Sequence, residues 1–91
     1  MSIRVNIFSP RIKQQIKDPD AVEVRGGTVG ECLRDLVRQF PGTEAWLFNE
    51  RGQLLRQVYV YVNAESAWKS DLAAPVKDGD TIIIASLITG G

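Results

Sequence analysis

The sequence predicts an α+β domain in which one amphipathic helix crosses the face of a mixed β-sheet. Three observations support this prediction: apolar residues alternate with polar ones near the N-terminus, a helical apolar pattern follows a capping motif at Thr28, and two β-rich runs, 58–62 and 81–87, follow the helix. A chain of 91 residues is enough for a single modest core. We therefore expect one domain over residues 1–91, with residues 88–91 as a flexible C-terminal tail.

Two short strands are predicted before the helix, over residues 3–8 and 21–25. Their apolar residues alternate at a period of two and are Ile3, Val5, Ile7, Val22 and Val24. Ser9-Pro10 ends the first strand, and Asp18-Pro19-Asp20 predicts a turn before the second. The two strands are expected to pair as a hairpin with a long loop.

The clearest local signal is the start of the helix. Gly26-Gly27 breaks the second strand, and Thr28 with Glu31 three residues later fits a capping box. The apolar residues that follow the spacing of one helical face are Val29, Cys32, Leu33, Leu36, Val37 and Phe40. Pro41-Gly42 ends the helix. The glycines before Thr28 resemble an anion-binding loop, but the Gly-Lys-Ser/Thr ending is missing, so we expect a strand-to-helix turn.

The second half predicts a shorter helical piece and two strands. Residues 43–48 are compatible with one further helical turn that brings Trp46 and Leu47 or Phe48 inward, and residues 49–52 are expected to form a surface turn. The run 58–62 places valines on one face and tyrosines on the other. A tight turn over 75–80 precedes the run 81–87, which is apolar on both faces and is therefore expected to lie centrally in the sheet or to carry a binding patch.

The core is expected between the helix and the inner face of the sheet. Its predicted members are Ile3 or Val5, Ile7, Val22, Val24, Leu33, Leu36, Val37, Phe40, Val60, Val62, Leu72, Ile82 and Ile84. Cys32 lies on the same helix face, where cysteine packs as a small hydrophobe, so a packing role is favoured over a reactive thiol.

The composition excludes several classes of function. Eleven basic residues balance eleven acidic ones, which leaves no surplus of positive charge for nucleic acid or for an anionic membrane. The N-terminus alternates apolar and polar residues, and no run reaches transmembrane length, so we expect a cytoplasmic protein that is monomeric when free. The chain has no histidine and one cysteine. We therefore expect no His-based catalytic dyad, no disulfide framework and no metal site.

An apolar patch is expected on the outer face of the sheet. If the valines of 58–62 face the helix, Tyr59 and Tyr61 face outward and meet Ile83 and Ala85 of the last strand. Scattered exposed apolar residues are common on protein surfaces. A patch beside the tail would nevertheless suit docking, so we expect a partner-binding surface formed by Tyr59, Tyr61, Ile83, Ala85 and Leu87.

The sequence ends in Gly90-Gly91, shortly after the apolar run. The bland interpretation is a frayed terminus. Glycines, however, lack side chains that would block a narrow channel, and they adopt backbone angles closed to other residues. The terminal carboxylate of Gly91 is ionised at neutral pH. It can attack the α-phosphate of ATP in another protein's active site, and a sulfur nucleophile can then displace the nucleotide to leave a thiocarboxylate.

Several features of the second half occur together and cover the run VYVYVNAES from Val58, then Leu72, then PVKDGDTIIIASLITGG. They are a strand ending in Val62-Asn63, the turn Asp78-Gly79-Asp80, an apolar strand, and Gly90-Gly91. In these features the chain resembles the MoaD/ThiS family of β-grasp, ubiquitin-like sulfur carriers, which includes the small subunit of molybdopterin synthase and the carrier of the thiamine pathway. The first half agrees in the order of its elements and in the helix that begins at Thr28, so the resemblance covers essentially the whole chain.

The resemblance implies a β-grasp fold and a carrier that is not itself an enzyme. An ATP-dependent, E1-like adenylating enzyme would activate Gly91, a sulfur donor would convert it to a thiocarboxylate, and a sulfur-acceptor synthase would take the sulfur. ATP would be used by the adenylating enzyme, and the carrier would hold no cofactor tightly. Similar carriers use the outer sheet face for docking, in agreement with the patch at Tyr59, Tyr61 and Ile83.

The receiving pathway stays open among molybdopterin, thiamine and cysteine synthesis. Molybdopterin-type carriers commonly have proline and valine shortly before an Ala-Gly-Gly end, whereas this chain has Leu87-Ile88-Thr89. The stretch 49–57 is longer than thiamine-type carriers usually need, and its length together with VYVYVNAES is similar to the carriers of cysteine synthesis. Two other functions remain open: a ubiquitin-like modifier joined through Gly91 to lysines, and a non-covalent interaction module in which Gly90-Gly91 has no role.

Overall fold

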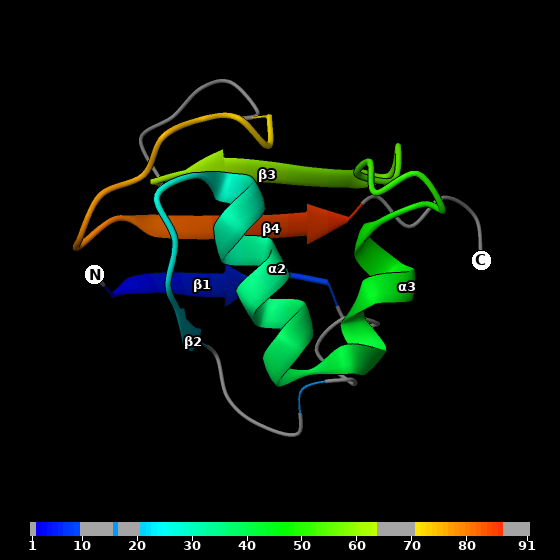
Figure 1. Cartoon of the computed structure of the whole chain (residues 1–91), viewed down its shortest axis with the longest axis horizontal. Coiled ribbons are helices and arrows are strands. Elements are labelled where there is room, and N and C mark those ends of the chain that lie inside the picture. The colour runs from blue at the N-terminus through cyan, green and yellow to red at the C-terminus, as the bar shows by residue number, and fades with distance from the viewer. Residues whose placement is uncertain (1, 10–15, 17–20, 64–70, 87–91) are drawn as a thin grey trace.

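Four strands form one mixed sheet in the computed structural model, with the helices on one side of it (Figure 1). The structure describes residues 2–9, 16, 21–63 and 71–86. In chain order the elements are β1 (Ile3–Ile7), β2 (Ala21–Val24), α2 (Val29–Gln39), a 3₁₀ turn (Pro41–Thr43), α3 (Glu44–Leu47), β3 (Val58–Val62) and β4 (Thr81–Ser86). The predicted α+β class, its element order and the extra helical turn after the main helix are confirmed.

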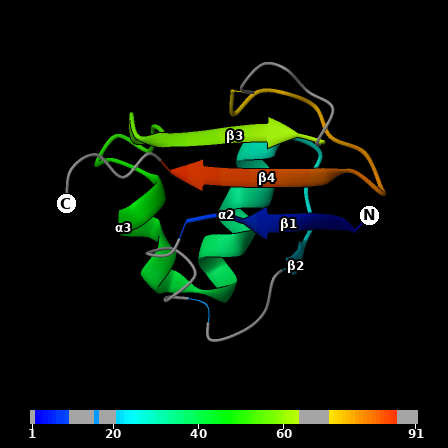
Figure 2. The same ribbon diagram turned by 180° about the vertical axis from the view of Figure 1, so that it is seen from behind.

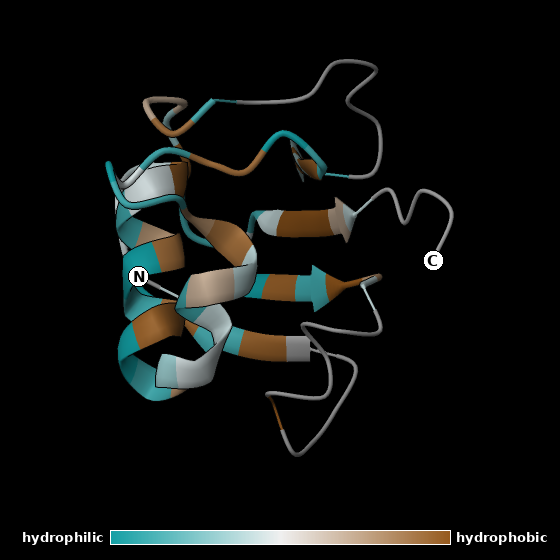
Figure 3. Ribbon diagram, turned by 90° about the vertical axis from the view of Figure 1, so that its right-hand side faces the viewer, coloured by the Kyte–Doolittle hydropathy of each residue, from teal (hydrophilic) through white to brown (hydrophobic). Residues whose placement is uncertain are grey.

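The sheet has the strand order β2-β1-β4-β3. β1 pairs antiparallel with β2 and parallel with β4, and β3 pairs antiparallel with β4. The predicted opening hairpin and the internal position of β4 are therefore confirmed. Edge-on, α2 and α3 lie on one side of the sheet, and hydrophobic and hydrophilic residues alternate along β1, whereas β4 is hydrophobic along most of its length (Figure 3).

The capping box at the start of α2 forms as predicted, with one difference in its partners. The Glu31 N–H donates to Thr28 Oγ1 at 3.2 Å, while the Glu31 carboxylate accepts from the Gly27 N–H at 2.7 Å. The glutamate thus reaches one residue further back than in the usual motif, where it accepts from the N-cap residue itself. The helix ends at Phe40, whose N–H donates to the Leu36 carbonyl at 2.8 Å.

Replacing Thr28 with alanine is expected to lower the free energy of unfolding by about 0.5–2 kcal/mol, because the Glu31 N–H loses its acceptor. Urea denaturation of the variant measures the loss. Thr28→Ser keeps an oxygen at the same position and serves as the control. A Thr28→Ala variant as stable as the parent would show that this cap adds nothing to the helix.

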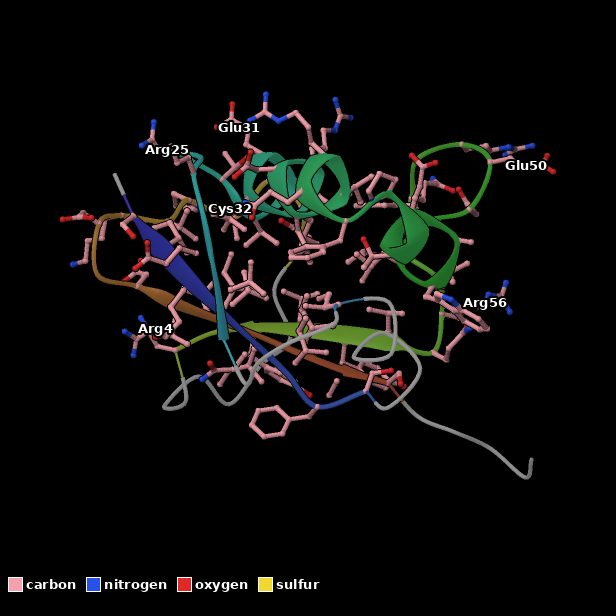
Figure 4. All side chains as sticks on the ribbon, turned by 90° about the horizontal axis from the view of Figure 1, so that it is seen from below. Arg4, Arg25, Glu31, Cys32, Glu50 and Arg56 are labelled. Atoms are coloured by element: carbon pink, nitrogen blue, oxygen red, sulfur yellow. The ribbon has the colours of Figure 1, made fainter. Side chains whose placement is uncertain are left out.

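The core lies between α2 and the inner face of the sheet, as expected. Both Ile3 and Val5 are fully buried, although only one of them was required by the prediction. The predicted members that are buried are Ile7, Val22, Val24, Leu33, Leu36, Val60, Ile82 and Ile84, and Cys32 is buried with them. Figure 4 shows Cys32 between α2 and the sheet.

Four predicted core residues need correction, since they are only partly buried and pack against the edge of the core: Val37, Phe40, Val62 and Leu72. Phe40 caps the end of α2 and Val62 ends β3, so the opposite layer covers each only in part. Leu47 and Val58 are buried too, as the extra helical turn and the alternation over 58–62 predicted. The buried residues Ile16 and Val76 were missed, and both come from irregular segments. Periodicity gives no signal where an element contributes a single buried side chain.

No helix in the described parts of the chain is both long and apolar enough to cross a membrane.

Candidate functional site

The outer face of the sheet brings four of the predicted site residues together. Tyr59 lies opposite Ala85, and Tyr61 lies opposite Ile83, in the antiparallel pairing of β3 with β4. All four are half-buried. No helix of the described residues covers this face, which Figure 2 shows from the side opposite α2. The other three predicted site residues, Leu87, Gly90 and Gly91, lie outside the described residues.

Phe8 adds to this patch and was missed from the sequence. Its side chain is 65% exposed, and it is the one large hydrophobic residue so exposed among the described residues. Phe8 follows Ile7 in an alternation that buries Ile3, Val5 and Ile7, so it belongs to the outer face. Its N–H donates to the Ile84 carbonyl at 2.7 Å, which continues the parallel pairing with β4. The sequence did contain a signal for it. Phe8 comes directly after three alternating residues that face inward, so the alternation itself places Phe8 on the outward side.

The opposite end of the same face is polar. Arg4 lies opposite Glu23 on one side and opposite Thr81 on the other. Figure 4 shows Arg4 projecting from the side of the sheet away from α2. The face therefore changes from charged at the start of β4 to apolar at its end, and the apolar end is where residues 87–91 begin. We name the group Phe8, Tyr59, Tyr61, Ile83 and Ala85 the apolar sheet patch.

The last residue of β4 is held from both sides. The Ser86 hydroxyl donates to Ser9 Oγ at 2.8 Å, and Ser9 is only 2% exposed. On the other side Ser86 lies opposite Val58 at the start of β3. The strand is thus anchored up to its final residue, which gives the following segment a fixed origin.

The first residues of β4 are fixed by the motif residues 63 and 78–80. Asn63 has a left-handed backbone, with φ of 66°. Its N–H donates to the Thr81 carbonyl at 2.6 Å, and its Oδ1 accepts from the Thr81 N–H at 3.0 Å. Asp80 accepts from the Lys77 N–H at 2.9 Å and from Asn63 Nδ2 at 3.2 Å, and these two bonds lower the pKa of the Asp80 carboxyl. Both motifs therefore have a structural role, because their hydrogen bonds fix the register of β4. We assign neither of them to a ligand site.

The start of α2 offers no anion site, because its donors are already bonded. The Val29 N–H donates to the Ala74 carbonyl at 2.9 Å and the Gly30 N–H to the Leu72 carbonyl at 2.8 Å. The next two N–H groups bond to the Thr28 side chain and to the Thr28 carbonyl. The strand-to-helix turn expected for these glycines is confirmed.

Cys32 is not a nucleophile in this environment. Burial raises the pKa of its thiol to about 11, with smaller contributions from Glu31 and Asp35. The thiol is therefore protonated at neutral pH, and the thiolate is the reactive form. Among the described residues no three His, Cys, Asp or Glu side chains lie together in a way that would hold a metal ion.

The comparisons with known proteins agree with this architecture. A family model described as the ThiS family matches residues 10–91. A chain of the BexX/CysO complex from Amycolatopsis orientalis is 33% identical, with a TM-score of 0.82 over 98% of this chain and 99% of that one. CysO from Mycobacterium tuberculosis is 27% identical, with a TM-score of 0.80 over 94% of this chain and 99% of that one.

The fold itself matches a further structure very well. SAMP1 from Haloferax volcanii has a TM-score of 0.86 over 100% of both chains, at 24% identity. Comparison with curated protein sequences gives no match. The β-grasp fold implied by the resemblance is confirmed by these likenesses.

Proposed function

Since the chain belongs to the ThiS family, we propose that it carries sulfur as a thiocarboxylate on Gly91. The family and the ubiquitin-like fold support a role as a sulfur carrier or small protein modifier. The observation that carries the finer proposal is that the family match runs through Gly91. The anchored end of β4 is consistent with it, because it fixes the point from which the last residues start.

The proposed chemistry takes place in the active sites of partner enzymes. A carboxylate oxygen of Gly91 attacks the α-phosphorus of ATP, and the bond to pyrophosphate breaks to leave an acyl-adenylate. Sulfur at the oxidation level of sulfide, supplied by a donor, then attacks the carbonyl carbon and AMP leaves. The product thiocarboxylate passes its sulfur to an acceptor synthase. The carrier needs no bound cofactor for these steps, since ATP is held by the adenylating enzyme.

The carrier's own contribution is to present the carboxylate and to be recognised. Glycines at 90 and 91 put no side chain in the way of a narrow channel. The apolar sheet patch would dock the adenylating enzyme, since aromatic and large aliphatic side chains are the usual anchors of protein interfaces. Three of its members are Tyr61, Ile83 and Phe8.

Two measurements on the natural protein test the proposal. Intact mass of protein made in its own host should show Gly91 as the C-terminal residue and a fraction with sulfur in place of one oxygen. The resolution must separate this replacement from oxidation of Met1 or tryptophan, which is nearly isobaric. The cognate adenylating enzyme should also catalyse ATP–pyrophosphate exchange that depends on the carrier. A carrier that never supports exchange would overturn the proposal, and high-mass lysine conjugates in place of the thiocarboxylate would favour the modifier.

Ile83→Asp is expected to raise the KM of the adenylating enzyme for the carrier by about tenfold or more. The substitution would place a charge in a desolvated apolar contact. Ile83 is half-buried on the outer face, so the fold should survive. Thr81→Asp is the matched control, since it adds the same charge on the same face of β4 but at its polar end. An unchanged KM for Ile83→Asp would remove the apolar sheet patch from the interface.

A further inference from the structure

A groove opens on the helical side of the molecule, between α2 and the turn that follows α3. Its volume is about 840 Å³. Val37, Ala45 and Phe48 supply its apolar lining, and Val37 and Phe48 also pack against the core. These two partly buried side chains therefore form the floor of the groove, which an apolar side chain of a binding partner can contact.

The far side of the groove is lined by Asn49, Glu50 and Gly52, which belong to the stretch 49–57 whose role the sequence left unexplained. Phe48 bridges to Leu54, and the Asn49 N–H donates to the Gln53 carbonyl at 2.8 Å, which closes a short turn. Asn49 Oδ1 accepts from the N–H groups of Arg51 and Gln53 at 2.8 and 3.0 Å. The turn is thus an ordered wall and not a loose insertion.

The two sides of the groove carry opposite charges. Arg34 and Arg38 lie four residues apart on α2 and form a basic wall. Glu44 on α3 and Glu50 on the turn form an acidic wall. Figure 4 shows Glu50 on the turn beyond α3, on the same side of the sheet as α2.

Arg38 is held in place while staying open to solvent. Its guanidinium pairs with Asp35, whose side chain is 11% exposed, whereas the Arg38 side chain is 79% exposed. Hydrogen bonds from the Arg38 guanidinium, the Arg25 backbone N–H and the Gln39 side-chain amide lower the pKa of the Asp35 carboxyl, which therefore stays ionised at neutral pH. A positioned arginine loses less side-chain freedom on binding a carboxylate.

The shape of the groove favours a protein segment over a small molecule. Seven of its nine lining residues are exposed, and only Val37 and Phe48 are partly buried. Small-molecule sites usually bury roughly 70–90% or more of the ligand's surface. A groove this shallow would leave more of a small ligand exposed. An apolar contact between oppositely charged rims is instead the arrangement of a protein interface.

The groove lies at the end of the molecule where β4 finishes. The Leu55 N–H donates to the Leu47 carbonyl at 2.9 Å and the Val58 N–H to the Leu55 carbonyl at 3.0 Å, which leads the turn into β3. Val58 in turn lies opposite Ser86. Figures 1 and 2 both show the segment after α3 beside the end of β4. An enzyme that holds the residues after Ser86 would therefore meet this groove.

We propose that the groove is a second docking surface for the adenylating enzyme. Its occupant is a segment with one bulky apolar side chain, a carboxylate facing the basic wall and a cation facing the acidic wall. This inference rests on the proposed function, because it assigns a second contact to the same partner. With the groove and the apolar sheet patch together, one enzyme would contact both the helical layer and the sheet around the end of β4.

Arg34→Glu tests the proposal in the full-length chain with ATP–pyrophosphate exchange by the cognate adenylating enzyme. We expect KM for the carrier to rise about tenfold with kcat unchanged, since the contact positions the carrier and takes no part in the chemistry. Salt supplies a second readout. The KM of the parent should rise with ionic strength more steeply than that of the variant, because the variant has lost an attractive ion pair.

Arg25→Glu is the matched control, with the same change of charge at an exposed site outside the groove. Figure 4 places Arg25 at the opposite end of the molecule from Glu50. Both variants should keep the melting temperature of the parent. If Arg34→Glu has the KM of Arg25→Glu, the groove is not a contact and the inference fails, while adenylation still stands. If no carrier supports exchange, the proposed function fails.

Sedimentation at the assay concentration tests the one remaining alternative, in which the groove binds a second copy of this chain. A parent chain that dimerises and an Arg34→Glu variant that does not would show that the groove binds a second copy, and this would overturn the assignment to the enzyme. A monomer for both, with the altered KM, is the expected result.

Discussion

Deleting Gly91, or adding one residue after it, is expected to abolish activation by the adenylating enzyme and to leave the stability of the fold unchanged. Gly91 lies five residues beyond Ser86, the last residue of β4. Among the described residues the last buried core side chain is Ile84, so we expect the free energy of unfolding to stay unchanged. Activation, by contrast, requires one particular carboxylate to stand in line with the α-phosphorus of ATP.

The size of the effect follows from geometry. A misplacement on the order of 1 Å can cost about 10²-fold in rate. One residue of extended chain moves the carboxylate by about 3.3 Å or more. ATP–pyrophosphate exchange should therefore fall by at least about 10²-fold in both variants.

Two controls separate this effect from a general disturbance of the chain. One residue added before Met1 changes the length equally and should leave exchange unchanged. Gly90→Val should be harmful, because a β-branched side chain narrows the allowed backbone angles and fills the channel, whereas Gly90→Ala should retain more activity. A chain lacking Gly91 that is still adenylated and still passes on sulfur would end the carrier proposal.

The fold could be predicted largely because each element has a local signal. Thr28 and Glu31 mark the helix start, and the valines and tyrosines of 58–62 separate the two faces of β3. The apolar run Ile82, Ile83 and Ile84 predicts an internal strand. β4 does lie between β1 and β3, although the helices cover only one of its two faces (Figure 3). Each of these signals involves residues that are close together in the sequence, so it can be recognised without knowledge of the tertiary structure.

What the sequence did not show depends on contacts between distant segments. Ile16 and Val76 are buried although they lie outside the helices and strands, and no periodicity reports this. The groove needs the flank of α2 at Arg34 beside a turn at Asn49, and these meet only in the folded chain. The apolar sheet patch was nearer to prediction, since alternation alone orients Tyr61 and Ile83, but Phe8 joins it through the parallel pairing of β1 with β4.

Gly26 lies in the strand-to-helix turn, where the sequence predicted only a break after the strand. The structure shows that a side chain has no room at this position. A Cβ at this position would lie 2.8 Å from the backbone nitrogen of Cys32 and 2.8 Å from the Glu31 Cβ. It would also lie 3.0 Å from the Cys32 sulfur. Neither neighbour can yield easily, because the Cys32 N–H donates to the Thr28 carbonyl at 3.0 Å within the first turn of α2.

Gly26→Ala is therefore expected to lower the free energy of unfolding by about 2–4 kcal/mol, a large part of the roughly 5–15 kcal/mol that holds a domain folded. Gly27→Ala is the matched control one residue away. Its Cβ would meet only the Glu31 Oε1 at 3.4 Å, an ordinary van der Waals distance, so its effect should be small. Urea denaturation of the parent and both variants gives the comparison. Equal losses for the two glycines would show that the close approach of Gly26 to α2 does not limit the fold, whereas a loss confined to Gly26→Ala would identify this contact as the reason that the chain needs glycine before its helix.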